Sequence, residues 1–478
     1  MPALLLLPII PGLWLAFKAW RTGLPFVLRV PLMLLPLVIS QIYNIQHTLF
    51  GSIAGPDVPA WILQLQIWAF MAMILVFLAS LLWDTGRVLV RLARFLAGKG
   101  PSRQAPGTQD GRQGDTQAAG PEASSRKVDT VPPPPASSAP APASSVPASA
   151  SPRSSASAPS APAHRPVLSR RRFLTGSAAC SMGLFVPAGA LVSGLGVSSA
   201  IAVPALHPWD LFVPELPDEL DGLRLVHLAD LHLGPLSRRA SLARLVRSIN
   251  GAEPDLVCLS GDLADGSPAW RCADATPRGS LARELAGLRS RFGTFACTGN
   301  HEYYSSYSRW MRLWKEQGIR FLHNEHVVLP VKNGSSLVLG GLDDPVGGVR
   351  TSATSAFAKA PKDRERTFRV LLDHKPGAAA GNARTGAQLQ LSGHTHGGQC
   401  LGLSQVIARA NAGFVRGWYT PQGMPLYVTS GAALWSGFAM RLGVPSEAAL
   451  ICLHKGPRLR FCEQPVPGCQ QGKPPREA

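Results

Sequence analysis

Long apolar runs in the first part of the chain predict helices that cross a membrane. These runs cover residues 3–17, 24–43 and 61–83. The third run has no charged residue over 23 positions, which exceeds the about 20 residues that a helix needs to span a bilayer. Helices buried in a protein core normally keep a polar face over such a length. We therefore predict three membrane spans within residues 1–95.

The composition changes after the third apolar run. Residues 96–168 are dominated by Pro, Ala, Ser and Gly, and four consecutive prolines occupy positions 132–135. A segment of this composition buries too little apolar surface to offset the entropy that it would lose on folding. We therefore predict a disordered linker.

The linker is followed by the sequence SRRRFLTG at positions 169–176, after which no charged residue occurs until Asp210. Paired arginines before a weakly hydrophobic, Gly/Ala-rich core are typical of a twin-arginine export signal, although this motif is internal. An ordinary fourth transmembrane helix with a basic cytoplasmic flank fits the same residues. Both interpretations of residues 169–204 stay open, and both predict that the chain crosses the membrane there.

The basic residues of the loops predict the orientation in the membrane. Lys18 and Arg21 follow the first run, residues 44–60 contain no Lys or Arg, and the linker is basic. Because positively charged loops are retained in the cytoplasm, four spans would place residues 205–478 outside the cytoplasmic membrane.

The net charge of +18 does not indicate a nucleic-acid-binding protein. Residues 1–204 contain 16 basic and 6 acidic residues, and residues 205–478 contain 31 and 23, so the excess charge is divided between the two parts. Part of it flanks apolar runs, where it determines membrane topology. We expect no nucleic-acid partner, and an anionic lipid or a phosphate ester instead.

The eight cysteines contain no CxxC pair, so the sequence predicts no cysteine metal site. Cys462 and Cys469 are near enough in sequence to close a small loop in an oxidising compartment, but their spacing leaves this open.

From residue 224 onward, short apolar runs alternate with amphipathic stretches, which predicts alternating strands and helices. Strands are expected at 224–229, 256–260 and 293–299, and helices at 238–249 and 279–290. Trp310 and Trp314 have helical spacing, which favours packing in the core or against lipid over a substrate platform.

Polar motifs with metal-binding side chains follow the strand-like runs. These motifs are DLH (230–232), GD (261–262), GNHE (299–302), His374 after RVLLD, and GHTH (393–396). Each is weak alone, but α/β sheets gather catalytic groups at the carboxyl ends of their strands. Mixed imidazole and carboxylate ligands suit manganese, iron and zinc, and two such ions can clamp a phosphoryl group. The ordered set therefore predicts a two-metal site.

This ordered set resembles the calcineurin-like metallophosphoesterase superfamily over about residues 222–454. GHTHGGQ, at 393–399, resembles its membrane-anchored bacterial branch, in which transmembrane helices precede the enzyme domain. The resemblance implies an α/β fold of the α+β type, a two-sheet β sandwich flanked by helices, over residues 205–478. It also implies a bacterial inner-membrane location, with the catalytic domain on the periplasmic side by the charge argument above.

The resemblance further implies two divalent ions, of manganese, iron or zinc, and hydrolysis of a phosphomonoester or phosphodiester by a hydroxide that bridges them. Asp230, His232 and His396 would bind the first ion. Asn300, His374 and His394 would bind the second, and Asp262 would bridge the two. His301 would contact phosphate and protonate the leaving oxygen without binding metal.

The membrane anchor favours an amphipathic substrate, such as a phospholipid. The resemblance adds UDP-2,3-diacylglucosamine, a precursor in lipid A biosynthesis, although that substrate is cytoplasmic. The alternative is a catalytically silent membrane scaffold or sensor, which lost metal ligands would mark, and no ligand is lost. The sequence departs from the family pattern in the charges of Asp373 and Lys375 beside His374, and in Ser430, where relatives often carry Arg.

Overall fold

The computed structural model describes residues 8–50, 60–97, 170–304, 306–433, 435, 438 and 440–464. The predicted linker from residue 98 onward and Cys469 lie outside the described residues. By contacts between Cα atoms, the described residues up to Gly86 and those from Arg170 onward belong to one unit, whereas residues 87–97 do not.

The predicted membrane spans form helices in the described residues. Apolar helices are α2 (Ile9–Trp20), α3 (Phe26–Ser40), α4 (Ile42–Phe50), α5 (Ala60–Leu96) and α6 (Arg170–Ala200). Stretches of α5 (Trp61–Leu96) and α6 (Gly183–Ala200) are long and apolar enough to cross a membrane. Helices α2 and α3 have 12 and 15 residues, fewer than the about 20 that a straight span takes. Whether these two cross the bilayer stays a prediction.

Polar side chains among these helices pair with one another. Lys18 Nζ lies 2.9 Å from Asp84 Oδ2, and Gln46 donates a hydrogen bond of 3.0 Å to Gln66. Ser193 Oγ in α6 donates to the carbonyl of a residue in α5 at 2.9 Å. Pairing of this kind is what a low-dielectric surrounding requires of polar groups.

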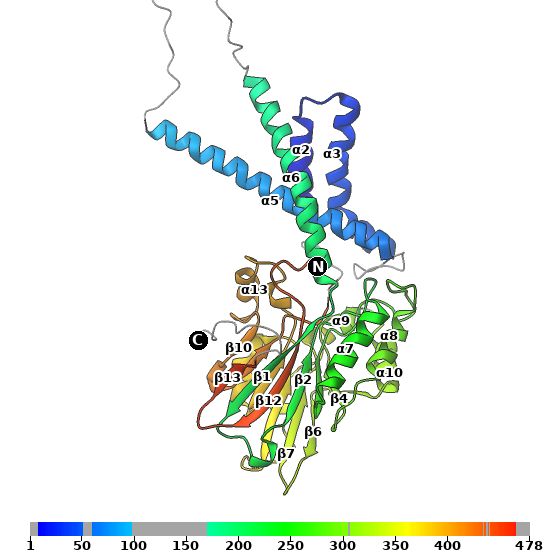
Figure 1. Ribbon diagram of the computed structural model, residues 1–478, viewed down its shortest axis with the longest axis vertical. Coiled ribbons are helices and arrows are strands. Elements are labelled where there is room, and N and C mark those ends of the chain that lie inside the picture. Colours follow the sequence, from blue (N-terminus) through cyan, green and yellow to red (C-terminus); the bar gives the residue numbers. More distant parts are fainter. Residues whose placement is uncertain are drawn as a thin grey trace, which may run out of the picture. The chain divides into compact units, whose positions relative to one another are not determined.

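Residues 205–463 form two mixed sheets, whose strands Figure 1 shows as arrows. The first sheet has the order β13-β1-β12-β2-β3-β4-β5. Its strands are β1 (Ala205–Val213), β2 (Arg224–Leu228), β3 (Leu256–Ser260), β4 (Thr294–Cys297), β5 (Ile319–Phe321), β12 (Glu447–Lys455) and β13 (Arg460–Glu463).

The second sheet has the order β10-β11-β9-β8-β7-β6. Its strands are β6 (Glu325–Pro330), β7 (Ser336–Gly341), β8 (Thr367–Leu372), β9 (Leu389–Ser392), β10 (Gly417–Tyr419) and β11 (Leu426–Val428). The expected two-sheet sandwich flanked by helices is confirmed.

Both faces of each sheet are buried. On β3, Leu256 and Cys258 point into the core between the sheets, whereas Val257 and Leu259 pack against helices on the outer face. This is the two-residue alternation of a strand. It explains why β3 reads as a continuous apolar run, as fully buried strands do.

Helices cover the outer faces of both sheets. The first sheet is covered by α7 (Arg239–Gly251), α8 (Arg278–Leu285) and α10 (Tyr307–Glu316), which Figure 1 shows on one side of β4. Near the second sheet lie α11 (Ala353–Ala356) and α12 (Ala379–Arg384). Trp310 and Trp314 are 1% and 0% exposed and stack at 5.2 Å in the first of these layers, so their predicted packing role is confirmed.

The remaining short helices lie in connections between strands. They are α9 (His301–Tyr304), α13 (Ser404–Ala410), and the 3-10 turns η1 (Asp218–Leu220), η2 (Pro345–Gly347), η3 (Pro376–Ala378), η4 (His396–Gly398) and η5 (Pro421–Gly423).

Parallel pairing brings the carboxyl ends of the central strands together. Strands β2, β3, β4 and β5 are parallel neighbours in the first sheet, as are β7, β8, β9 and β11 in the second. The strands predicted at 224–229, 256–260 and 293–299 are confirmed as β2, β3 and β4, and the two predicted helices as α7 and α8. The polar motifs therefore begin where these strands end.

Candidate metal centre

The seven residues that the sequence singled out as metal ligands follow the carboxyl ends of five strands, and the donor atoms of six of them come together in two groups. Connections after β2, β3 and β4 carry those from the first sheet, and connections after β8 and β9 carry those from the second. In chain order they are Asp230, His232, Asp262, Asn300, His374, His394 and His396.

The first group of donor atoms comes from Asp230, His232 and His396. The Nε2 atoms of the two histidines are 3.1 Å apart. Asp230 Oδ1 lies 3.6 Å from Nε2 of His396 and 3.9 Å from Nε2 of His232. Three donor atoms converging in this way could hold one metal ion, and carboxylate with imidazole is a donor set that suits zinc, iron and manganese.

The second group comes from Asp262, His374 and His394. His374 Nε2 lies 3.1 Å from Asp262 Oδ2, and the rings of His374 and His394 are 5.1 Å apart. The buried Oδ1 of Asn300 has no hydrogen-bond partner among the described residues. A buried amide oxygen without a partner is costly, and a metal ion would give it one. These residues therefore fit a second ion.

Asp262 lies within reach of both groups. Its Oδ2 atom is 3.1 Å from Nε2 of His374 in the second group and 3.9 Å from Nε2 of His232 in the first. A carboxylate in this position can bridge two cations.

The histidine pKa values describe how charge is balanced here. Burial lowers the pKa of His394 to about 3 and that of His396 well below its usual value, which leaves both imidazoles in the neutral form that binds metal. Burial would also lower the pKa of His374, but Asp262 and Asp230 raise it to about 10. The aspartates thus favour positive charge at this point, which either a proton or a metal ion supplies.

Strained backbone conformations are concentrated at the ligands. Asp230, His232, Asp262, His394 and His396 have φ angles of 55°, 38°, 54°, 70° and 49°. Left-handed backbone costs a non-glycine residue of the order of 1–3 kcal/mol and persists where the surroundings enforce it, commonly at functional sites.

Two glycines allow the close approach of the loops after β3 and β4. Gly261 has a φ of +86°, and a Cβ atom on it would lie 2.5 Å from the backbone nitrogen of Gly299. A Cβ atom on Gly299 would lie 2.2 Å from Oδ1 of Asp262. Only glycine avoids these clashes, so the GD and GNHE motifs need their glycines to bring the aspartate into place.

His301 lies beside both donor groups but is held by a different carboxylate. Its Nδ1 atom donates to Oδ1 of Asp265 at 2.6 Å, and its backbone N–H donates to Oδ1 of Asp262 at 2.8 Å. Burial would lower the pKa of His301, but Asp262 and Asp265 raise it to about 9. The imidazole is therefore positively charged near neutral pH. Asp265 accepts from its Nδ1 atom, so the proton on Nε2 is not held by Asp265.

Asp265 is a site residue that sequence reasoning missed. Its Oδ1 accepts from Nδ1 of His301 and, at 3.1 Å, from Nδ1 of His232. Burial would raise the pKa of Asp265, but the two histidines hold it well below its usual value. One carboxylate thus orients two imidazoles, His232 and His301, which also form a possible metal-binding group with Asp262, and carboxylates behind metal ligands often act in this way. The sequence signal for it was a second aspartate three residues after Asp262, in the stretch GDLAD.

Glu302 is a second missed residue, which holds the two loops in register. Its carboxylate accepts from the backbone N–H groups of Asp262 at 2.9 Å, Leu263 at 2.6 Å and Gly299 at 2.6 Å. The GNHE motif therefore contributes His301 to the site and Glu302 to its support.

A calcineurin-like phosphoesterase family model matches residues 223–398, the segment that carries all seven donor residues and His301. An uncharacterized metallophosphoesterase from Aquifex aeolicus is 31% identical over 190 residues, which cover 39% of this chain and 68% of that protein. The chain belongs to the calcineurin-like phosphoesterases, a family of metal-dependent phosphoester hydrolases.

Relatives of this chain include animal as well as bacterial proteins. A Bos taurus protein named transmembrane protein with metallophosphoesterase domain is 31% identical over 299 residues. The match covers 59% of this chain and 64% of the bovine protein, less than two thirds of its length. Among solved structures, the calcineurin-like phosphoesterase YfkN from Bacillus subtilis is 16% identical over 48% of this chain and 90% of that one, with a TM-score of 0.29.

The two charged residues beside His374 have structural partners. Lys375 Nζ pairs with Asp344 at 2.9 Å. Asp373 accepts a 2.8 Å hydrogen bond from Asn382, and burial raises the pKa of its carboxyl to about 6.

Arg441 is a third residue that sequence reasoning missed. It is 1% exposed, and its Nη2 donates to the carbonyls of Ser430 at 2.7 Å and Ala433 at 2.8 Å. The same atom lies 3.4 Å from Nδ1 of His396. Arg441 thus places a buried guanidinium beside the loop that carries Ser430, and no local pattern signalled it.

Cysteines are absent from the two donor groups. The described cysteines are free thiols, namely Cys258, Cys272, Cys297, Cys400, Cys452 and Cys462. Asp210, Cys452 and His454 form a separate half-exposed group on adjacent strands, in which Asp210 Oδ1 and His454 Nε2 already pair at 2.9 Å. The predicted lack of a cysteine metal site and the predicted Cys462–Cys469 loop both stay untested.

Proposed function

We propose that this protein is a membrane-anchored phosphoesterase that holds two divalent metal ions and hydrolyses a phosphomonoester or phosphodiester linked to a lipid. The position of Asp262 carries the proposal, because its Oδ2 lies 3.1 Å and 3.9 Å from a histidine of each donor group. Two bound ions of manganese, iron or zinc would make a water molecule nucleophilic near neutral pH and would stabilise charge on the phosphoryl oxygens.

The protein's own residues supply the rest of the chemistry. His301 is placed to contact the phosphate and to give its Nε2 proton to the leaving oxygen, since Nδ1 is engaged by Asp265. General acid catalysis of this kind contributes about 10²–10⁴-fold. Asp265 keeps the ring in one orientation, and Glu302 keeps the loop that carries His301 against the loop that carries Asp262.

The apolar helices support a substrate at the membrane. Stretches of α5 and α6 could each cross a bilayer, and β1 begins five residues after α6 ends. A phospholipid phosphate ester fits a domain tethered this closely, and a nucleotide-linked lipid precursor such as UDP-2,3-diacylglucosamine fits if the domain faces the cytoplasm. The basic loops support the opposite side, outside a bacterial inner membrane.

The alternative function is a catalytically silent membrane scaffold or sensor. The loss of metal-ligand residues would favour it. The sequence keeps all seven donor residues, and six of them lie in groups that could hold a metal ion, which supports hydrolysis over the scaffold.

The deciding experiment uses the full-length protein in nanodiscs. Metal is removed with a chelator and restored as manganese, iron or zinc, and hydrolysis of p-nitrophenyl phosphate, bis(p-nitrophenyl) phosphate and phosphatidic acid is measured. We expect at least one metal to restore hydrolysis of at least one ester. Stoichiometric metal binding without hydrolysis of any ester would favour the scaffold.

A further inference from the structure

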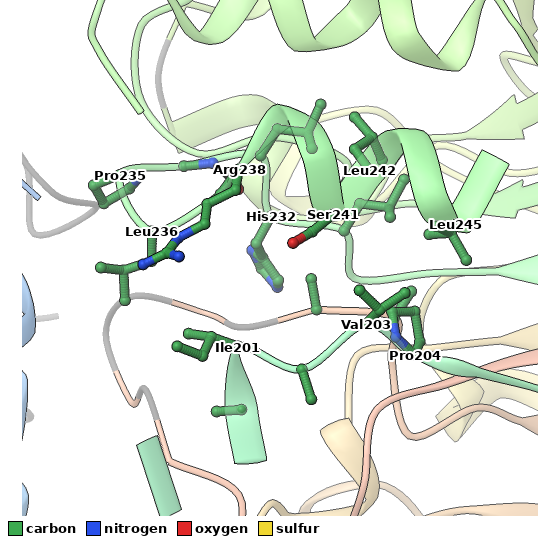
Figure 2. A pocket seen from close by; sticks show the side chains of 18 residues that line it. Ile201, Val203, Pro204, His232, Pro235, Leu236, Arg238, Ser241, Leu242 and Leu245 are labelled. Carbon is green, nitrogen blue, oxygen red and sulfur yellow. Dashed lines mark hydrogen bonds between the residues drawn. The ribbon is translucent and has the colours of Figure 1, made fainter. Parts of the chain in front are cut away.

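An apolar pocket lies beside the first donor group, between the end of α6 and the start of α7 (Figure 2). It has a volume of about 80 Å³ and is lined by the segment 200–204, the loop 231–238, the first turns of α7 and Ala432–Ala433. All but four of its 18 lining residues are apolar or glycine. Such a lining favours a hydrocarbon occupant over a sugar or a base.

One end of the pocket is continuous with a helix that could cross a membrane. The apolar stretch Gly183–Ala200 of α6 ends at the pocket, and Ala200 is itself a lining residue. Ala200 packs in one apolar cluster with Leu236, which lines the pocket from the other side. The backbone N–H of Arg441 donates to the carbonyl of Gly196 in α6 at 3.0 Å, which ties the helix to the domain.

The other end of the pocket is continuous with the metal centre. His232, a ligand candidate of the first donor group, lines the pocket, and Figure 2 shows its ring among the lining side chains. Ala432 and Ala433 form part of the wall, and their N–H groups donate to the carbonyls of Ala229 and Asp230. A molecule in the pocket would therefore lie directly beside the donor atoms.

The same pocket has one positively charged lining residue, Arg238. The exposed side chain of Arg238 makes no hydrogen bond or ion pair with any described residue. An unpaired guanidinium next to an apolar pocket matches a ligand that has an anionic headgroup and a hydrocarbon tail.

We infer that this pocket receives the acyl chain of a membrane phospholipid whose headgroup phosphate is the ester placed at the two donor groups. The inference rests on the proposed function and names its substrate class as a phosphate ester of a diacyl lipid, drawn from the leaflet that faces the domain. The pocket holds the first part of the chain beside His232, and the remainder of the chain stays in the bilayer next to α6. Arg238 meets the anionic headgroup.

A crosslinking map tests the occupant without requiring turnover. Full-length His301→Ala protein, which should keep both metals and hydrolyse the probe only slowly, is placed in phosphatidylcholine nanodiscs containing a trace of phosphatidic acid with a diazirine in one acyl chain. After irradiation, labelled peptides are identified by mass spectrometry. We expect labels within 200–204 and 231–245 in addition to α5 and α6. Labels confined to α5 and α6 would overturn the inference.

A matched pair of variants makes the test specific to the pocket. Ser241→Trp on α7 would fill the pocket from its wall. Ser248→Trp places the same side chain about two turns further along the helix, at an exposed position outside the pocket. We expect Ser241→Trp to abolish labelling of 200–204 and Ser248→Trp to leave it unchanged. Equal labelling of 200–204 in both variants would contradict the inference. If Ser241→Trp does not fold, the crosslinking map of the protein without either tryptophan substitution decides whether the pocket holds the acyl chain.

Kinetics with His301 intact separate this inference from the proposed function. For a long-chain lipid ester, Ser241→Trp should raise KM by about fourfold for each methylene kept out of the pocket, whereas Ser248→Trp should leave both this KM and hydrolysis of p-nitrophenyl phosphate within about twofold of the unmodified protein. Failure to hydrolyse any ester would reject the proposed function, but the crosslinking map would still decide what the pocket holds. Unchanged KM for the lipid in Ser241→Trp would overturn the inference alone.

Discussion

At the residue scale, one carboxylate oxygen serves two imidazoles with different tasks. Oδ1 of Asp265 accepts from His232, a metal-ligand candidate, and from His301, which stands outside both donor groups. Asp262 serves both donor groups directly. Replacing either aspartate should therefore affect more than one function, and the effects differ in whether metal is lost.

Asp262→Asn should remove most of the bound metal and nearly all phosphoesterase activity. The amide keeps the size of the side chain but lacks the negative charge needed between two cations. Elemental analysis of the purified protein measures the metal directly. Two metal equivalents remaining in the variant would show that Asp262 does not bridge the ions.

His301→Ala should keep both metals and slow hydrolysis by about 10²–10⁴-fold. The loss should be smaller for esters of p-nitrophenol, because a good leaving group needs little protonation. Rates are compared across esters with leaving groups of different pKa. A loss of equal size for every leaving group would indicate phosphate binding instead of proton donation.

Asp265→Asn should reduce activity by about 10–100-fold, the usual effect of removing a partner behind a metal ligand. Part of this loss acts through His301, so adding Asp265→Asn to His301→Ala should cost less than it does alone. Asp274→Asn, at an exposed aspartate of the same loop region, is the control and should leave activity unchanged. Additive losses of activity in the double variant would show that Asp265 does not act through His301.

At the scale of elements, parallel strands explain why separate motifs form one centre. The connections after β2, β3 and β4 end at one edge of the first sheet, and those after β8 and β9 end at the matching edge of the second. Each motif needed only a buried strand before it and a tight turn after it. Local patterns predict both features, whereas the pairing of β1 with β12 and β13, at the two ends of the domain, has no local signal.

Gly299→Ala tests the tight approach of two strand ends. The added Cβ would lie 2.2 Å from Oδ1 of Asp262, so the loop must shift by an ångström or so, and such misplacements cost about 10²-fold in rate. Activity and metal content are measured together, and both should fall. Gly381→Ala, where a Cβ meets nothing within 4 Å, should change neither. Normal metal content and rate in Gly299→Ala would show that the loop has more room than the structure indicates.

At the scale of the whole molecule, the apolar helices, if they span a membrane as proposed, would determine which substrates the domain meets. The third predicted span continues into a helix of 37 residues, and α6 runs for 31 residues toward the first strand of the domain. The side of the membrane on which the catalytic domain lies decides whether its substrate is a phospholipid of the outer side or a cytoplasmic nucleotide-linked precursor. It remains a prediction from the basic loops.

Reporter fusions test the sidedness. Alkaline phosphatase, which needs an oxidising exterior, should be active when fused after Leu206 and silent when fused near Ala150, because the basic linker is retained inside. Activity in the reverse pattern would place the catalytic domain in the cytoplasm. Replacing Arg170 and Arg171 with Lys should stall a twin-arginine substrate, whereas an ordinary fourth helix should still insert.

The sequence by itself determined which side chains could form the metal centre and which elements would carry them. Apolar strand-like runs followed by DLH, GD, GNHE and GHTH were enough, because buried strands and glycine turns are local features of a chain. Tertiary structure decided the roles of Asp265, Glu302 and Arg441, and the pocket beside His232. These depend on contacts such as that between His232 and His396, 164 positions apart, and on the close approach of α6 to the loop at Arg441. Such distances arise only when the sheets pack, so no local pattern of residues contains them.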